Sequence, residues 1–116
     1  MYRLTQIQFL VMAVLARQPM HLYAVRQEII ELTGHTYYPT SSTLKKATRV
    51  LMRAGHIEEC HSNPNYWLKA RRGVPYELTR QGRHRLEGEV SMYFGACQMI
   101  RGWLEYSNKF GGLGRI

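Results

Sequence analysis

The segment over residues 41–55, SSTLKKATRVLMRAG, most constrains what this chain can fold into. Its apolar positions recur at helical spacing and define one face, which consists of Leu44, Ala47, Thr48 and Leu51. Its basic residues fall on the other faces, and Gly55 is a typical stop for a helix. The segment therefore predicts a short helix with one buried face and one cationic face.

Two further helices are expected before this segment. Thr5 is expected to cap the first, over residues 5–16, before Pro19 interrupts the pattern. The second covers about residues 21–33 and stops at Gly34. Its apolar stripe is expected to consist of Leu22, Val25, Ile29, Ile30 and Leu32. Three short helices of this kind indicate a small helical core.

A β-hairpin is expected after the third helix. Residues 56–61 read as one strand, and the alternation of Val74, Tyr76 and Leu78 predicts a second. Pro75 suits an edge strand, because it has no N–H to donate. Helix, turn, helix, strand, basic loop and strand is the layout of a winged helix-turn-helix. We therefore expect a mainly α fold with a small β-hairpin, in which the polar loop over 62–73 is the wing.

The positive charge of the chain is uneven. The net charge is +8 and the pI is near 9.9, and between Thr40 and Arg85 ten basic residues face three glutamates. Clustering of this kind favours a polyanionic partner, of which double-stranded DNA is the commonest, and the alternative is a solvated basic face. The candidate DNA contacts are Ser41, Ser42, Thr43, Lys45, Lys46, Arg49, Lys69, Arg71, Arg72, His21 and Tyr23.

These candidates differ in their expected roles. Ser41 and Ser42 are expected to cap the third helix, where free N–H groups and the helix dipole also favour phosphate. Arg49 is the candidate for reading guanine, because its fork can donate two hydrogen bonds. The loop cations are expected to hold the DNA backbone. His21 and Tyr23 precede or begin the second helix and are candidates for phosphate contacts, although a half-buried core role is an alternative for Tyr23.

A fourth helix is expected from about Thr79 to Asn108. Its apolar residues alternate by four and three, which is a coiled-coil seam. Three glycines recur every seven residues on another face. We expect this helix to form a homodimer through Leu86, Val90, Tyr93, Cys97, Ile100, Trp103 and Leu104. Trp103 and Tyr93 are candidates for stacking a small aromatic effector, with simple interface packing as the alternative.

The expected domain organisation has three parts. A winged-helix DNA-binding domain covers residues 1–78, a dimerisation helix covers 79–108, and a glycine-rich flexible tail covers 109–116. No signal peptide or membrane span is recognisable, so a cytoplasmic location is expected. Cys60 and Cys97 lie far apart and are expected to be buried, reduced thiols.

The sequence argues against an enzyme. It contains no aspartate, no glycine-rich phosphate loop and no paired-carboxylate arrangement. No cofactor is expected. His56, Cys60 and His61 are too weakly patterned to predict a metal site, and none is expected.

The ordered motifs over about residues 4–95 resemble the PadR-type bacterial transcriptional regulators. The residues that carry the resemblance are Leu4-Thr5, Gln18-Pro19, His21-Leu22-Tyr23-Ala24-Val25, Glu28-Ile29, Thr33-Gly34, Ser41-Ser42-Thr43-Leu44, Leu51, Ala54-Gly55, Ile57 and Tyr76-Glu77-Leu78-Thr79-Arg80-Gln81-Gly82. Leu22, Ser42 and Lys45 depart from the glycine, glycine and tyrosine usual in that family.

The resemblance implies a homodimeric regulator, usually a repressor, with a winged helix in each subunit. The third helix would enter the major groove of a pseudo-palindromic operator, and the wing would rest on the backbone or the adjacent minor groove. The fourth helix would be the dimer element, near which some members bind small aromatic compounds. The alternative is a plasmid or phage winged-helix protein that binds repeated DNA sites or a protein partner. Because two departures lie at helix starts, the operator is expected to differ from the family's usual one.

Overall fold

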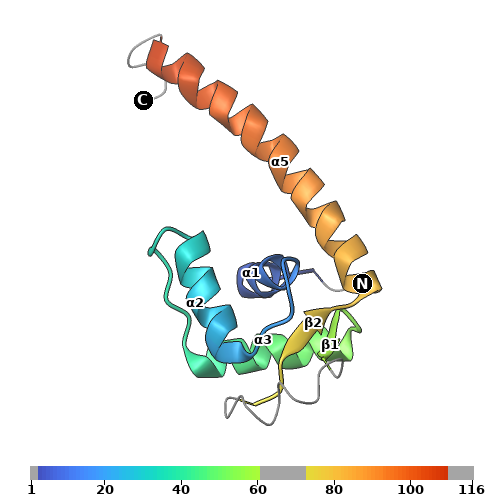
Figure 1. Ribbon diagram of the computed structural model, residues 1–116. Helices are drawn as coiled ribbons and strands as arrows, with labels where there is room; N and C mark the ends of the chain where they lie inside the picture. Colours follow the sequence, from blue (N-terminus) through green and yellow to red (C-terminus); the bar gives the residue numbers. More distant parts are fainter. Residues whose placement is uncertain (1–2, 61–72, 110–116) are drawn as a thin grey trace. The chain divides into compact units, whose positions relative to one another are not determined.

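A computed structural model describes residues 3–60 and 73–109 of the chain. Its elements, in chain order, are α1 (Gln6–Leu15), α2 (Leu22–Leu32), α3 (Ser41–Arg53), β1 (Ile57–Glu59), β2 (Tyr76–Leu78) and α5 (Arg80–Lys109) (Figure 1). The described part is mainly helical with a small antiparallel hairpin, as the sequence predicts. The chain divides into two compact units, residues 1–86 and 87–116. The first turns of α5 therefore belong to the first of these units.

Helix α1 begins where the sequence predicts. Thr5 is its N-cap, and the Thr5 hydroxyl accepts a hydrogen bond from the Gln8 backbone N–H at 3.2 Å. The Gln8 side chain accepts in return from the Thr5 N–H at 3.0 Å. This reciprocal capping box satisfies two backbone donors that a helix start would otherwise leave unpaired.

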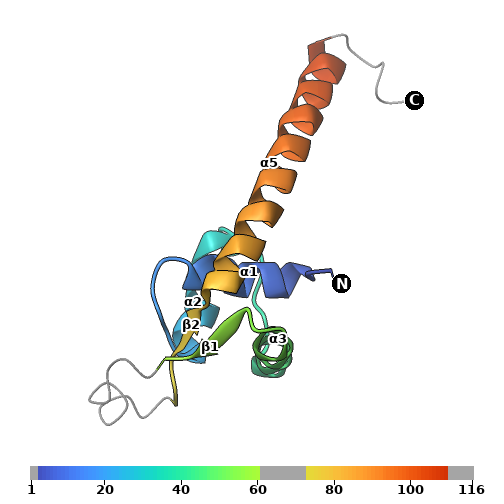
Figure 2. The ribbon, with the colours of Figure 1, turned by 90° about the vertical axis from the view of Figure 1, so that its right-hand side faces the viewer.

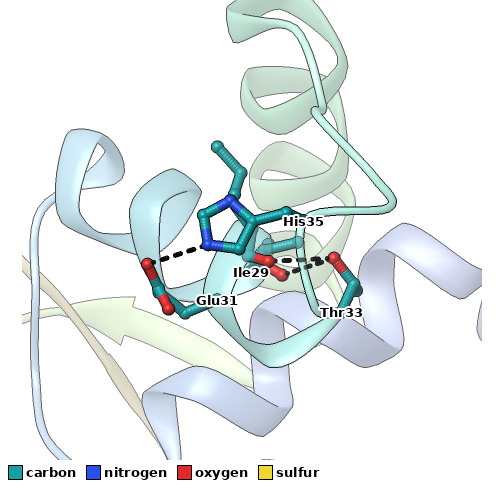
Figure 3. A network of polar contacts seen from close by, with 5 residues as sticks. Ile29, Glu31, Thr33 and His35 are labelled. Atoms are coloured by element: carbon teal, nitrogen blue, oxygen red, sulfur yellow. Dashed lines mark hydrogen bonds and ion pairs between the residues drawn. The ribbon is translucent and has the colours of Figure 1, made fainter.

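Helix α2 ends in a tight polar turn, which Figure 3 shows from close by. Gly34 and His35 both adopt left-handed backbone conformations, with φ of 63° and 62°. The Thr33 hydroxyl donates to the carbonyl oxygens of Ile29 and Ile30, and His35 Nε2 lies 3.3 Å from a Glu31 carboxylate oxygen (Figure 3). The predicted stop at Gly34 is therefore correct.

One expectation for this region is wrong. Leu32 is 58% exposed, because it falls in the last turn of α2, beyond the part that packs on the core.

Thr40, and not Ser41 or Ser42, caps α3. The Thr40 hydroxyl accepts from the Thr43 N–H at 3.2 Å, and Ser41 and Ser42 lie in the first helical turn. All three residues are suitable caps by type, so their backbone conformations decide which one is used. The predicted inner face of the helix is confirmed, since each of its four residues is buried.

The hairpin pairs Ile57 with Leu78 and Glu59 with Tyr76. Tyr76 also forms a backbone bridge with Met20, so β2 is flanked on both sides. Pro75 precedes β2, and its carbonyl accepts from the Cys60 N–H at 2.8 Å. Apart from the single bridge with Met20, β2 is an edge strand of a two-stranded sheet, as the sequence predicts, and Pro75 lies just outside the paired residues.

The core of the first unit lies where α1, α2, α3 and the hairpin meet (Figures 1 and 2). Helix α1 contributes more residues to this core than any other element, and both α2 and α3 pack against α1. The fully buried large side chains include Met12, Ile29, Leu44, Leu51 and Ile57. Leu86 of α5 is also buried in this core, at 7% exposure.

Thr79 connects the start of α5 to the end of α3. Its hydroxyl donates to the Gly55 carbonyl at 2.6 Å and accepts from the Gly82 N–H at 2.9 Å. Its own N–H donates to the His56 carbonyl at 3.0 Å. Gly55, at φ 79°, supplies the left-handed turn that brings these groups together. One residue therefore serves as the cap of α5 and as the clasp between two helices.

Burial of His56 makes folding sensitive to mild acid. Burial, and secondarily the charge of Arg85, hold the pKa of His56 below its usual value of 6.5. The unfolded chain therefore binds a proton that the folded chain does not, and stability is lost as the pH falls through 6.5. Urea unfolding at pH 7.5 and pH 5.5 is expected to show a lower free energy of unfolding at the lower pH. His56→Gln should reduce this difference, and an unchanged pH dependence in that variant would contradict the assignment.

Candidate nucleic-acid interface

The outer surface of α3 is exposed and cationic. Lys45, Lys46 and Arg49 are exposed, and among the described residues none of the three has a carboxylate partner. Two glutamates of α2 pair with residues outside α3 instead: Glu28 pairs with Arg17 at 2.8 Å, and Glu31 pairs with His35. The α3 cations are therefore free to meet an external anion, which is the arrangement that the sequence predicts.

The starts of α2 and α3 lie near each other. After α2 the chain runs back along that helix before α3 begins (Figure 1). Arg26 Nε donates to the Pro39 carbonyl at 2.8 Å and fixes this return. Ser41 and Ser42 are exposed, and Thr43 is half-buried with its hydroxyl 2.9 Å from that of Thr40. The hydroxyl-rich start of α3 is therefore accessible.

His21 and Tyr23 differ in their exposure. His21 is buried at 7% exposure, and its Nδ1 accepts from the Ala24 N–H at 3.3 Å, so it caps α2. The phosphate contact of His21 stays a prediction, and the structure shows that its Nδ1 is already used as a helix cap. Tyr23 is 56% exposed, so the alternative of a half-buried core role is wrong and its ring remains available at the surface.

Part of the predicted site lies outside the described residues. This applies to the loop cations Lys69, Arg71 and Arg72, and to His61 of the weak metal pattern. Within residues 3–60 and 73–109, no group of three potential metal ligands occurs. No helix in this part of the chain is long and apolar enough to cross a membrane. Cys60 is buried but Cys97 is exposed, and both are free thiols, so only Cys60 fits the predicted burial.

A groove beside α3 was not anticipated from the sequence. It has a volume of about 290 Å³ and is lined by Leu22, Lys45, Thr48, Arg49, Met52 and Tyr76. Four of these residues form a stripe along α3 at helical spacing, which is the sequence signal that could have revealed it. Burial and the nearby Glu59 raise the pKa of Tyr76 above its usual 10.0, so its hydroxyl stays protonated. The groove is lined by cations, hydroxyls and apolar groups, and none of its six residues is acidic.

Most of the predicted dimer residues lie on exposed parts of α5 in the second unit. Their exposures range from 43% for Tyr93 to 63% for Trp103, and Cys97 is also exposed. Leu86 differs, because it is already buried in the core of the first unit. No described side chain lies within 4 Å of where a Cβ would stand on Gly88, Gly95 or Gly102. The exposed seam therefore begins at Val90.

Several solved structures share this fold. No protein-family model matches the sequence, and no curated protein matches it. The chain is 23% identical to smu.1704 from Streptococcus mutans UA159, over 90% of this chain and 94% of that one, with a TM-score of 0.69. A PadR family transcription regulator from Clostridium difficile R20291 is 18% identical, over 86% of this chain and 99% of that one, with a TM-score of 0.69.

A third similar structure is a PadR-like transcription factor from Bacteroides fragilis. It is 15% identical, over 83% of this chain and 87% of that one, with a TM-score of 0.64. At these identities the likeness establishes the architecture and not the partner. The chain therefore has the fold of the PadR-like regulators, as its ordered motifs predict.

Proposed function

We propose that the protein is a sequence-specific, DNA-binding transcriptional regulator. The observation that carries the proposal is the unpaired cationic face of α3, which is exposed on one side and anchored in the core on the other. An exposed helix of this type on a helix-turn-helix scaffold suits the major groove. The regulator from Clostridium difficile and the transcription factor from Bacteroides fragilis share this fold, and their names support the same function for this chain.

The proposed contacts divide into two kinds. Arg49 reads a base edge, because it projects from the middle of the exposed face of α3 and can donate two hydrogen bonds to guanine. Lys45, Lys46 and the exposed hydroxyls at the start of α3 hold phosphates, together with Tyr23. Lys69, Arg71 and Arg72 are proposed to contact the backbone, on the strength of the sequence alone.

We also propose that two copies associate through α5 and act as a repressor. Val90, Tyr93, Ile100 and Leu104 leave large apolar side chains 43–61% exposed along one seam. Removal of such side chains from water favours association at about 25 cal/mol per Å² of apolar area. A symmetric dimer presents two copies of α3, which suits the two half-sites of a pseudo-palindromic operator.

Arg49→Ala is expected to weaken binding to the operator by about 1–3 kcal/mol and to relax base preference at one position. The measurement is fluorescence anisotropy on the selected duplex and on single-base variants. Arg17→Ala is the matched control, because it removes the same charge from a cation that is paired with Glu28. Equal affinities for Arg49→Ala and Arg17→Ala would remove Arg49 from the interface.

A footprint across the gene's own neighbourhood tests the biological role. One palindrome over a promoter supports a repressor. An array of repeats would instead indicate a segregation or control protein, and an absence of any footprint at low salt would indicate a protein partner.

A further inference from the structure

The groove beside α3 contains a buried polar group that the protein itself leaves unpaired. Thr48 is 3% exposed, and its hydroxyl oxygen has no hydrogen-bond partner among the described residues. A buried hydroxyl without a partner is destabilising, because it has lost its hydrogen bonds to water and gained none in return. Valine has nearly the same shape and would avoid this cost, so the hydroxyl calls for an external explanation.

The surroundings of Thr48 indicate the chemistry of the missing partner. Lys45 and Arg49 flank Thr48 on α3, and neither has a carboxylate partner in the described part of the chain. Leu22 and Met52 add apolar surface, and the protonated Tyr76 hydroxyl can donate. The groove therefore suits a group that joins an anion to a compact apolar body. It is too small for a peptide helix, which is about 10 Å across.

We propose that this groove seats one deoxyribose–phosphate unit of the bound DNA strand, with Thr48 donating its hydroxyl to a phosphate oxygen. Lys45 and Arg49 lie on the cationic face already proposed to meet DNA, so this inference rests on the proposed function and adds a residue to it. The sugar lies against Leu22 and Met52, and the phosphate lies toward the cations.

The proposed contact has a signature that separates it from the cationic contacts. Thr48→Val removes a neutral donor, so it is expected to weaken binding about tenfold on every duplex and to leave the salt dependence unchanged. Lys45→Gln removes a charge, so it is expected to lower the slope of log affinity against log salt by about 1. Thr48→Ser retains the hydroxyl and should bind within about twofold of the wild type.

The experiment measures anisotropy of the full-length chain on the footprinted duplex and on a scrambled one at several salt concentrations. Urea unfolding of both Thr48 variants provides the folding control, and Thr48→Val is expected to be at least as stable as the wild type. Equal DNA affinity of Thr48→Val and the wild type would overturn this inference and leave the proposed function standing. Failure of the wild type to bind any duplex at low salt would overturn the proposed function, and this inference with it.

Free phosphate presents the same anionic chemistry and is tested separately. The melting temperature is measured in inorganic phosphate and in chloride at equal ionic strength. A phosphate-specific rise that Thr48→Val abolishes, together with unchanged DNA affinity in that variant, would assign the groove to a free anion and overturn the proposal. No phosphate-specific rise, together with the tenfold loss on DNA, supports the proposal.

Discussion

Gly82→Ala is expected to destabilise the first unit by about 3 kcal/mol or more. A Cβ on Gly82 would overlap the backbone carbonyl oxygen of His56 and would also press on Leu78. That carbonyl accepts the Thr79 N–H and cannot move without breaking the clasp between α3 and α5. Overpacking costs about 1–3 kcal/mol in a side-chain core, and here the obstacle is backbone. The measurement is the free energy of unfolding in urea.

Gly88→Ala is the matched control on the same helix. No described side chain would lie within 4 Å of its Cβ, so the substitution should gain the helix propensity of alanine, about 1 kcal/mol. The two substitutions are chemically identical and are expected to act in opposite directions. A similar small effect at both positions would contradict the close approach of α5 to His56.

Ile100→Glu is expected to dissociate the proposed dimer and to reduce operator affinity by more than about 100-fold. Ile100 is 46% exposed in the single chain, so a glutamate there stays solvated in the monomer but is buried beside apolar groups in the dimer. Two monomers then bind the two half-sites independently. The second α3 no longer benefits from the high effective concentration that the dimer provides once the first α3 is bound. Sedimentation gives the mass, and anisotropy on the whole operator gives the affinity.

Gln98→Glu controls for the added charge. Gln98 is exposed on the same helix but lies off the seam, so this variant is expected to remain dimeric and to bind normally. Dissociation by both variants would indicate a general charge effect. A wild-type chain that sediments as a monomer at tens of micromolar would refute the dimer itself.

The helices and the buried face of α3 could be predicted because they follow from local periodicity. Leu44, Thr48 and Leu51 recur at a spacing that only a helix places on one face, and each is buried. The order of elements around them then leaves few compact arrangements, which is why the hairpin was also predictable.

The remaining features depend on three-dimensional context that spacing does not encode. Thr40, Ser41 and Ser42 are equally suitable caps by type, and the return of the chain along α2 decides for Thr40. His21 matches a phosphate contact in sequence, yet packing buries it as a cap.

Tertiary packing also explains the position of Leu86 and the groove. Leu86 fits the heptad pattern of α5, but the first unit extends into that helix and buries it. The groove unites residues from α2, α3 and β2 that lie far apart in the chain, so the stripe along α3 marks only one side of it in the sequence.

The base of the hairpin is closed independently of what lies between its strands. Three sets of hydrogen bonds hold residues 55–60 and 75–82 in fixed register. They are the pairing of β1 with β2, the bond from the Cys60 N–H to the Pro75 carbonyl, and the bond from the Thr79 hydroxyl to the Gly55 carbonyl. Because loop-closure entropy rises only slowly with length, the intervening segment can be lengthened or rewritten at small cost in stability. Segments from other proteins could therefore be grafted between Cys60 and Pro75, which would test the proposed part of this segment in DNA preference while α3 is held constant.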